Sequence, residues 1–442
     1  MKLSEIATFV EDKISSNSIS LADYVTTDSL LPNKEGKALA TNLPPVICSL
    51  THFRKGDVLV ANIRPYLKKV WLADKEGGCS SDVLVFRVKE GNKSSFLYAI
   101  MLQDRFFDYT MKGAKGSKMP RGDKDQIMRY ELPTFSPQEQ ENIGNLVISI
   151  TNKLWLNRSI NHNLEAMAKQ LYDYWFVQFD FPNEKGKPYK SSGGGMVWNE
   201  KLHREIPHDW DVVNLSEYLN VYTEKVSANN LGTSCKYAPI EVLPRRRMSF
   251  NECSPIENAV SGLCRFRKKQ ILLSNRRVYF HKVCIAAFDG VTRDTVIILN
   301  PKNKALLGYA YQIVNDDAFI EYATRHSYGS EQPVLSWESA KIYKTFKPRN
   351  QLDIIYSKRI CPIIDSVTKN ELEIAKLIKQ RDELLPLLMN GQVSVNYDLA
   401  YQTSFFFLNA IVRSIACSCM DFISLVRFIS SRNNAFTLFS AV

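Results

Sequence analysis

Basic and aromatic residues gather in two stretches of the chain, on turns between short apolar runs. The first stretch contains Arg54, Lys55, Arg64, Tyr66, Lys68 and Lys69, followed by Lys115, Lys118 and Arg121. The second contains Arg245, Arg246, Arg247, Arg267, Lys268, Arg276, Arg277 and Arg293. Lysine and arginine neutralise phosphates, and arginine also hydrogen-bonds base edges in the major groove. Each charge taken singly is more simply a solvated surface charge, but two clusters at matching places favour DNA binding.

Motifs for catalysis and for cofactor or metal binding are missing from the sequence. Residues 113–120 are rich in glycine and lysine but lack the spacing of a phosphate-binding loop, which favours a flexible basic loop. The Pro-Pro step in residues 42–46 is similar to a methyltransferase catalytic loop, but Leu43 intervenes and no aromatic residue follows. Cys417 and Cys419 alone cannot form a tetrahedral metal site, and HExxH is absent. We therefore expect a non-catalytic protein that binds no cofactor and no metal.

The composition also restricts the partner and the compartment. The chain has 57 Lys and Arg residues against 46 Asp and Glu residues, a formal net charge of +11, which favours nucleic acid before an acidic membrane surface. Nine cysteines without a CxxC pair, and no signal peptide, predict reduced thiols and a cytoplasmic location. The apolar tail from Phe405 is interrupted by Asn409, Arg413 and Asp421, so we expect no membrane span.

A single long helix is predicted from Ser136 to about residue 178. Ser136 is the expected N-cap, Pro137 the first helical residue, and Glu139 completes a capping box. Apolar residues then recur every seven positions, with Lys153 as an exception, in one row at Ile143, Ile150, Asn157, Leu164 and Leu171 and a second at Leu146, Ile160, Met167 and Tyr174. About 40 residues at 1.5 Å each give about 60 Å. So long a helix with so narrow an apolar seam requires a partner helix.

The second half of the chain repeats the first at an offset of 212 to 213 residues. FRKGDVLVANIRPY at residues 53–66 corresponds to FRKKQILLSNRRVY at residues 266–279, and FFDYT at Phe106 corresponds to FIEYA at Phe319. The offset is nearly constant over the whole half. We interpret the chain as a tandem duplication.

The repeat supplies the partner helix at residues 350–390. Asn350 is the expected N-cap, with Asp353 at the third helical position, and Gly391 is the expected C-terminal cap. The row equivalent to that of the first helix contains Tyr356, Ile363, Asn370, Leu377 and Leu384.

Asn157 and Asn370 lie at the midpoints of the two predicted helices. In an antiparallel pair only the midpoint residues meet their own counterparts, and a hydrogen bond between these asparagines would fix the orientation. The alternative is that both face solvent and that the row is assigned one position off. An antiparallel pair would separate two DNA-reading domains by more than one turn of B-DNA, about 34 Å.

The predicted fold class is α+β, with two tandem domains, each followed by a long helix, and the two helices pairing as an antiparallel coiled coil. We expect strands at 57–63, 81–88, 269–275 and 294–300, and one helix per domain, at 95–110 and 305–324. The predicted boundaries are a first domain at 1–135, a helix at 136–179, an exposed linker at 180–206, a second domain at 207–349, a helix at 350–391 and an atypical apolar tail at 392–442.

This organisation resembles the specificity subunit of type I restriction-modification systems over residues 1 to about 395. The resemblance is carried by the tandem plan, by TFSPQEQENI at Thr134, by the segment FPNEKGKPYKSSGGGMVWNEKLHREIPHDW and by IKQRDELLPLLMNGQVSV. It implies a non-enzymatic subunit whose two target-recognition domains each read one half of a bipartite site in double-stranded DNA. It also implies that the helices act as a spacer and dock two modification (methyltransferase) subunits and, through them, restriction subunits.

Two features depart from this family pattern. The start of the second helix, KPRNQLD, lacks the proline and the EQ pair of the first. The tail from about Asn396 has no counterpart in the repeat and is either a gene-junction end or a helix that docks on a partner. A coiled-coil scaffold whose domains bind protein is the alternative function.

Overall fold

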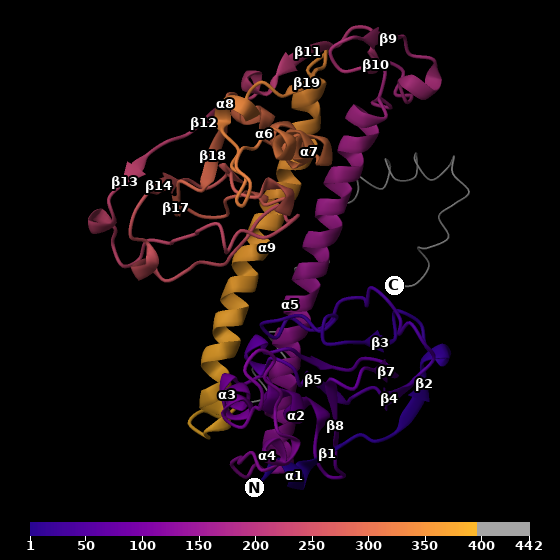
Figure 1. The fold of residues 1–442 in the computed structure, drawn as a ribbon, viewed down its shortest axis with the longest axis vertical. Coiled ribbons are helices and arrows are strands. Elements are labelled where there is room, and N and C mark those ends of the chain that lie inside the picture. The colour runs from indigo at the N-terminus through magenta and orange to yellow at the C-terminus, as the bar shows by residue number, and fades with distance from the viewer. Residues whose placement is uncertain (396–442) are drawn as a thin grey trace. The chain divides into compact units, whose positions relative to one another are not determined.

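A computed structural model describes residues 1–395, and these residues form two compact units. Unit 1 comprises residues 1–151 together with the chain from Arg381, and unit 2 comprises residues 152–380. Each unit contains sheets, short helices and parts of two long helices (Figure 1). The mixed helix and sheet content agrees with the predicted fold class.

Unit 1 contains two four-stranded sheets. The first has the order β1-β8-β5-β6, formed by Ala7–Phe9, Val83–Val88, Val58–Ala61 and Val70–Leu72. The second has the order β2-β4-β7-β3, formed by Lys13–Ser15, Ser49–Phe53, Gly77–Cys79 and Tyr24–Val25. Side chains of β5 alternate between two cores: Val58 and Val60 pack with the short helices, and Leu59 and Ala61 pack with Phe53. The helices are α1 (Leu3–Ile6), α2 (Ser94–Met101), α3 (Asp104–Lys112) and α4 (Lys124–Met128).

Unit 2 repeats this architecture. Its first sheet has the order β12-β18-β15-β16, formed by Leu219–Val221, Val296–Pro301, Ile271–Ser274 and Val283–Ile285. Its second has the order β13-β14-β17, formed by Lys225–Val226, Leu263–Phe266 and Gly290–Arg293. Val58 pairs with Phe86 in unit 1, and Ile271 pairs with Leu299 in unit 2, each 213 residues later. The identical register confirms the internal repeat. The short helices are α6 (Leu307–Asn315), α7 (Asp317–Arg325) and α8 (Trp337–Ala340).

The four predicted strands are confirmed as β5, β8, β15 and β18, but the predicted helix of each domain is wrong in extent. Each is two helices, α2 with α3 and α6 with α7. The breaks lie at Gln103 and Asp316, which have the same extended backbone, with φ near −71° and ψ of 140°. The Asp316 carboxylate accepts a hydrogen bond from Ala318 N and so starts α7 as its N-cap.

The first long helix, α5, runs from Pro137 to Tyr172 and continues as a π-helical turn over Asp173–Val177. The predicted capping box is confirmed. Ser136 N donates to Glu139 Oε2 over 2.8 Å, and Glu139 N donates to Ser136 Oγ over 3.3 Å.

The second long helix, α9, runs from Leu352 to Met389. Asn350 is not its N-cap, because Asn350 and Gln351 both adopt the left-handed conformation, with φ of 56° and 54°. The predicted C-terminal cap is confirmed. Gly391, with φ of 69°, donates to Leu388 O, and Gln392 N donates to Leu387 O, the bonding pattern of a Schellman motif.

The most buried row of each long helix lies one turn from the predicted one. Along α5 and its π-helical turn, one heptad row is at most 4% exposed: Gln140, Val147, Leu154, Asn161, Ala168 and Trp175. The equivalent row of α9, after the half-buried Asp353, is at most 4% exposed: Ile360, Val367, Ile374, Arg381 and Leu388. Of the predicted rows, Ile143, Asn157 and Tyr356 are buried, and the others are half-buried: Ile150, Leu164, Leu171, Ile363, Asn370, Leu377 and Leu384. The predicted first row is therefore the less buried edge of the seam.

The predicted linker contains structure that its composition did not indicate. Strands β9 (Met196–Asn199) and β10 (Arg204–Pro207) form a hairpin within it, and β11 (Asp211–Asn214) pairs with β19 (Lys344–Lys347). Phe181 stacks between Tyr189 and Trp210, with ring centroids 4.6 and 5.1 Å away. These aromatic contacts anchor a glycine-rich segment, so part of it is packed and not exposed.

Helices long and apolar enough to cross a membrane do not occur among residues 1–395. The apolar tail from Phe405 lies outside the described residues.

Candidate nucleic-acid interface

A turn with the same unusual backbone follows the central strand of the first sheet in both units. We call it loop B, residues 64–68 in unit 1 and residues 277–281 in unit 2. Arg64 and Lys68 flank a 3₁₀ turn with φ of 51° and 52°, and Arg277 and His281 do so with φ of 47° and 53°. Left-handed backbone costs a non-glycine residue about 1 kcal/mol or more, and such residues concentrate at functional sites. Loop B is therefore the first candidate for a binding element.

Loop B is tied to a second loop by its main chain. We call this loop C, residues 115–121 in unit 1 and residues 328–334 in unit 2. Arg64 N donates to Pro120 O over 2.8 Å, and Arg277 N donates to Pro333 O over 2.9 Å. Gly116 in unit 1, like its counterpart in unit 2, has φ near 100°, which closes each loop C. The two loops of each unit thus form one continuous edge.

A third segment, Lys34 in unit 1 and Arg246 in unit 2, completes the arrangement. Lys34 N donates to Lys68 O over 2.8 Å, and Arg246 N donates to His281 O over 2.9 Å. The side chains of both residues bind the aspartate that begins the next helix, Asp104 or Asp317, over 2.8 Å. Burial would raise the pKa of Asp104, but hydrogen bonds from Lys34 and Lys68 outweigh it and lower that pKa. Asp104 therefore stays ionised, and its ion pair with Lys68 holds loop B of unit 1 in place.

Large side chains project to solvent from loops B and C. Tyr66 and Tyr279, at equivalent positions of loop B, are 50% and 49% exposed. On loop C, Met119 and Tyr328 are 51% and 63% exposed. Aromatic and basic side chains held on a rigid main chain are suited to contact nucleic acid.

The structure brings together only part of the basic cluster predicted in unit 1. Six predicted residues lie on loops B and C: Arg64, Tyr66, Lys68, Lys115, Lys118 and Arg121. Arg54 and Lys55 precede β5, whereas loop B follows it, so they lie at the opposite end of that strand. Lys69 is half-buried and donates to Thr27 O. The basic residues of 54–69 therefore do not share one surface, because the extended strand β5 separates the two parts of this stretch.

Unit 2 divides its predicted residues in the same way. Loop B of unit 2 carries Arg277 and directly follows Arg276. Beside this loop lie Arg245, Arg246 and Arg247, and the Arg245 guanidinium is 4.0 Å from the Phe280 ring centroid. Arg267 and Lys268 precede β15 and so lie at its other end, and Arg293 ends β17 in the second sheet.

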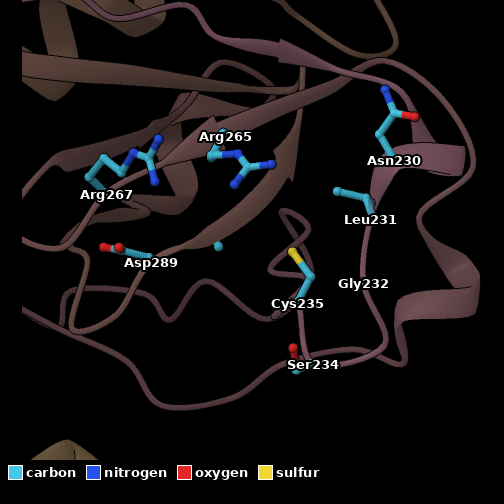
Figure 2. A pocket seen from close by; sticks show the side chains of 9 residues that line it. Asn230, Leu231, Gly232, Ser234, Cys235, Arg265, Arg267 and Asp289 are labelled. Carbon is cyan, nitrogen blue, oxygen red and sulfur yellow. The ribbon is translucent and has the colours of Figure 1, made fainter.

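A cavity of about 350 Å³ lies beside Arg267, away from loops B and C. Figure 2 shows Arg265 and Arg267 on one side and the loop with Asn230 and Leu231 on the other. Both arginines contact one carboxylate, that of Glu224, at 3.2 and 3.1 Å. The cavity is therefore separate from the candidate interface, and its positive charge is partly neutralised.

Ion pairs distinguish the predicted residues further. Acidic partners are present for Arg54, Lys68, Lys115, Arg121, Arg246 and Arg267. Within residues 1–395, Lys55, Arg64, Lys118, Lys268 and Arg277 have none. Arg64, Lys118 and Arg277 lie on loops B and C, so these three are the strongest candidates for phosphate contacts.

Sequence reasoning missed several residues of this surface. Tyr279, Met119, Tyr328 and Gln332 are exposed on loops B and C but were not predicted as site residues. The 213-residue offset from Tyr66 indicates Tyr279 directly. Met119 and Gln332 give no comparable indication, because neither residue type signals DNA binding by itself.

The long helices contact each other inside unit 2 through a buried polar cluster. Asn370 donates to Asn161 Oδ1 over 2.8 Å, and Asn161 donates to Glu371 over 2.9 Å. Asn157 donates to Glu373 over 3.1 Å. The predicted bond between Asn157 and Asn370 is therefore wrong by one helical turn, in keeping with the shift of the buried row.

Glu165, near this cluster, is expected to make stability depend on pH. Burial raises the pKa of its carboxyl to about 7, so between about pH 4.5 and 7 the folded state keeps a proton that the unfolded state releases. Stability then falls as pH rises through this window. We expect Glu165→Gln to raise the free energy of unfolding by up to about 3 kcal/mol near pH 8 and to change it little near pH 5.

Urea unfolding of both proteins at the two pH values measures this difference. Glu257→Gln, at an exposed position of the same unit, is the matched control. Its free energy of unfolding should differ from that of wild type by the same amount at both pH values. An advantage of Glu165→Gln that is the same at both pH values would contradict the assignment.

Metal-binding groups of three or more His, Cys, Asp or Glu side chains do not occur in the described part of the chain.

Comparison with known proteins points to one family. No protein-family model matches the chain. The MjaIX type I restriction enzyme specificity subunit of Methanocaldococcus jannaschii is 23% identical over 363 residues, covering 79% of this chain and 80% of that protein. The HindI specificity subunit of Haemophilus influenzae is 20% identical over 404 residues, covering 77% of this chain and 87% of that protein.

A solved structure agrees with these relatives. The crystal structure of the type I restriction-modification S subunit from M. genitalium matches with a TM-score of 0.55 at 15% identity, covering 88% of this chain and 95% of that one. The chain thus resembles type I restriction-modification specificity subunits in sequence over about four fifths of its length, and it shares their fold.

Proposed function

We propose that the chain is the non-catalytic DNA-reading subunit of a type I restriction-modification assembly. The observation that carries the proposal is the surface of loops B and C, which occurs once in each unit with the same left-handed turn and with exposed tyrosines. Exposed basic side chains lie on the loops of unit 1 (Arg64, Lys115, Lys118 and Arg121) and beside those of unit 2 (Arg245, Arg246 and Arg276). Two copies of one recognition surface suit a bipartite site in double-stranded DNA, with one half-site for each unit. The names of the relatives, specificity subunits of type I restriction enzymes, support the same function.

In this proposal, α5 and α9 pair as an antiparallel coiled coil that sets the distance between the half-sites. Contacts inside unit 2 support an antiparallel pair. Asn157 contacts Glu373, whereas Ala168, later in α5, accepts a hydrogen bond from Tyr356, which is earlier in α9. The two helices therefore run in opposite directions at these contacts. Inside unit 1, Ile143 shares a core with Leu388. The remaining helix surface would dock two modification subunits and, through them, restriction subunits, in the cytoplasm.

Footprinting of the chain assembled with its modification subunits tests the proposal. We expect two protected DNA patches separated by an unprotected spacer. The double variant Arg64→Glu/Lys118→Glu should weaken DNA binding at least about tenfold and lower the slope of log K against log salt by about 2, because two phosphate contacts are lost. Lys185→Glu, in the exposed part of the connector, is the matched control and should leave both unchanged.

One contiguous protected patch would count against a bipartite site. An assembly with no salt-dependent affinity for DNA would overturn the proposal altogether and would favour a scaffold whose domains bind protein.

A further inference from the structure

Loops B and C differ between the units at some positions and agree at others. Identical residues occupy seven paired positions: Asn62 and Asn275, Arg64 and Arg277, Tyr66 and Tyr279, Lys69 and Lys282, Gly116 and Gly329, Ser117 and Ser330, Pro120 and Pro333. Different residues occupy the remaining positions, among them Ile63 and Arg276, Lys115 and Tyr328, Lys118 and Glu331, and Met119 and Gln332. In these four pairs every side chain is exposed except that of Ile63, which is half-buried.

We propose that shared residues position both units on the DNA backbone and that two differing pairs, Ile63 with Met119 in unit 1 and Arg276 with Gln332 in unit 2, read the bases. This inference rests on the proposed function and assigns roles within its surface. Every half-site has the same sugar-phosphate chemistry, so one residue type can serve both units there. A residue that is identical in both units cannot make them prefer different bases. Only the differing positions can do so.

The shared positions suit backbone contact for structural reasons. The main chain of Arg64 and of Arg277 is fixed by its bond to loop C, and within residues 1–395 neither guanidinium has an acidic partner. Tyr66 and Tyr279 offer a ring and a hydroxyl, each about half exposed. Lys69 and Lys282 instead donate to carbonyl oxygens, those of Thr27 and Ile240, and so hold the loops together.

The differing positions carry different recognition chemistry in the two units. In unit 2, Arg276 Nη1 donates to Gln332 Oε1 over 3.0 Å, so the two side chains are held together. Arginine pairs with guanine and glutamine with adenine in the major groove. The equivalent residues of unit 1, Ile63 and Met119, offer only apolar contact, such as that made to a thymine methyl group. Unit 2 should therefore require a purine where unit 1 accepts thymine.

Exchange of these pairs between the units tests the assignment. Ile63→Arg/Met119→Gln gives unit 1 the pair of unit 2, and Arg276→Ile/Gln332→Met does the reverse. Each variant is assembled with the modification subunits, and the methylated sites are mapped in a random-sequence library at fixed salt. We expect each exchange to change the base preference in one half-site, leave the other half-site unchanged, and alter overall affinity by less than about tenfold.

The tyrosine variants are the matched comparison. Tyr66→Ala and Tyr279→Ala should each lower affinity about tenfold for all sequences without changing the preferred bases. Tyr66→Phe should recover most of that loss if the ring makes the contact. Thermal unfolding midpoints close to that of wild type show that each variant is folded.

The outcomes separate this assignment from the proposed function. A wild-type assembly that selects no bipartite sequence overturns both. If wild type selects two half-sites and the exchanged proteins select the same two, only the division between positioning and reading residues is wrong. A change of base preference in Tyr66→Ala would overturn it as well.

Discussion

Alanine at Gly77 or Gly290 is expected to destabilise the unit that contains it by about 3 kcal/mol or more. A Cβ at Gly77 would lie 2.1 Å from Asp23 O and 2.7 Å from the Phe53 ring. At Gly290 it would lie 2.6 Å from Lys236 O and 2.7 Å from the ring of the equivalent phenylalanine. Contacts this short require the neighbours to move.

Neither neighbour can move cheaply. Asp23 O accepts a hydrogen bond from Gly78 N, and Lys236 O accepts one from Val291 N over 2.9 Å. Phe53 and Phe266 are fully buried in their cores. An added methyl group must therefore break main-chain pairing of the second sheet or displace a buried ring. The same restriction applies at the equivalent glycine of each unit.

Denaturant unfolding followed by circular dichroism measures the loss. Gly232→Ala is the matched control in unit 2, because a Cβ there meets no atom within 4 Å and the backbone is not left-handed. The explanation fails if Gly290→Ala and Gly232→Ala unfold at the same denaturant concentration.

The repeat and its strands could be predicted because they depend on local composition and on comparison within one chain. Residues 58–61 and 271–273 are continuous apolar runs bounded by turn residues, the pattern of a buried central strand. The capping residues Ser136 and Gly391 act within one helical turn, so their types alone indicate the helix ends.

The buried row of the long helices could not be predicted in the same way. Ile143, Ile150, Leu164 and Leu171 are more apolar than the row one turn later, which includes Asn161 and Ala168. Burial depends on what packs against the helix, and in unit 2 this includes polar partners such as Glu371. Apolar periodicity finds the correct side of the helix but not its centre.

The candidate site was predicted in composition but not in geometry. Arg64 and Lys118 were identified by residue type, yet the main-chain bond from Arg64 N to Pro120 O joins segments more than 50 residues apart. Such tertiary pairing leaves no local pattern in the sequence. The fold also places Arg54 apart from loops B and C, because β5 lies between Arg54 and Arg64.

Gly144→Ser is the second substitution expected to have a large effect. Each long helix contacts the domain that precedes it in the chain, and this contact has room for one serine but not for two. In unit 1, Gly144 of α5 faces Ser95 of α2, and a Cβ at Gly144 would lie 2.2 Å from Ser95 Oγ. In unit 2 the equivalent residues are exchanged, with Ser357 on α9 and Gly308 on α6. We expect Gly144→Ser to lower the free energy of unfolding by about 2 to 3 kcal/mol through overpacking.

The arrangement in unit 2 predicts the rescue. Ser357 Oγ accepts a hydrogen bond from Tyr309 N over 2.9 Å, and Phe96 is the residue of unit 1 equivalent to Tyr309. In Gly144→Ser/Ser95→Gly, the new hydroxyl has the vacated space and lies beside Phe96 N, which now donates to Lys93 O and would share its hydrogen with the hydroxyl. The double variant should regain most of the lost stability, whereas Ser95→Gly alone should cost less than about 1 kcal/mol.

Denaturant unfolding of the two single variants and the double variant forms a double-mutant cycle. A favourable coupling free energy of about 2 kcal/mol is expected, since the two residues share one contact. Simple addition of the two single effects would show that the helices adjust around the added serine. That result would mean that the exchanged glycine and serine have no part in fixing how closely each long helix packs on its domain.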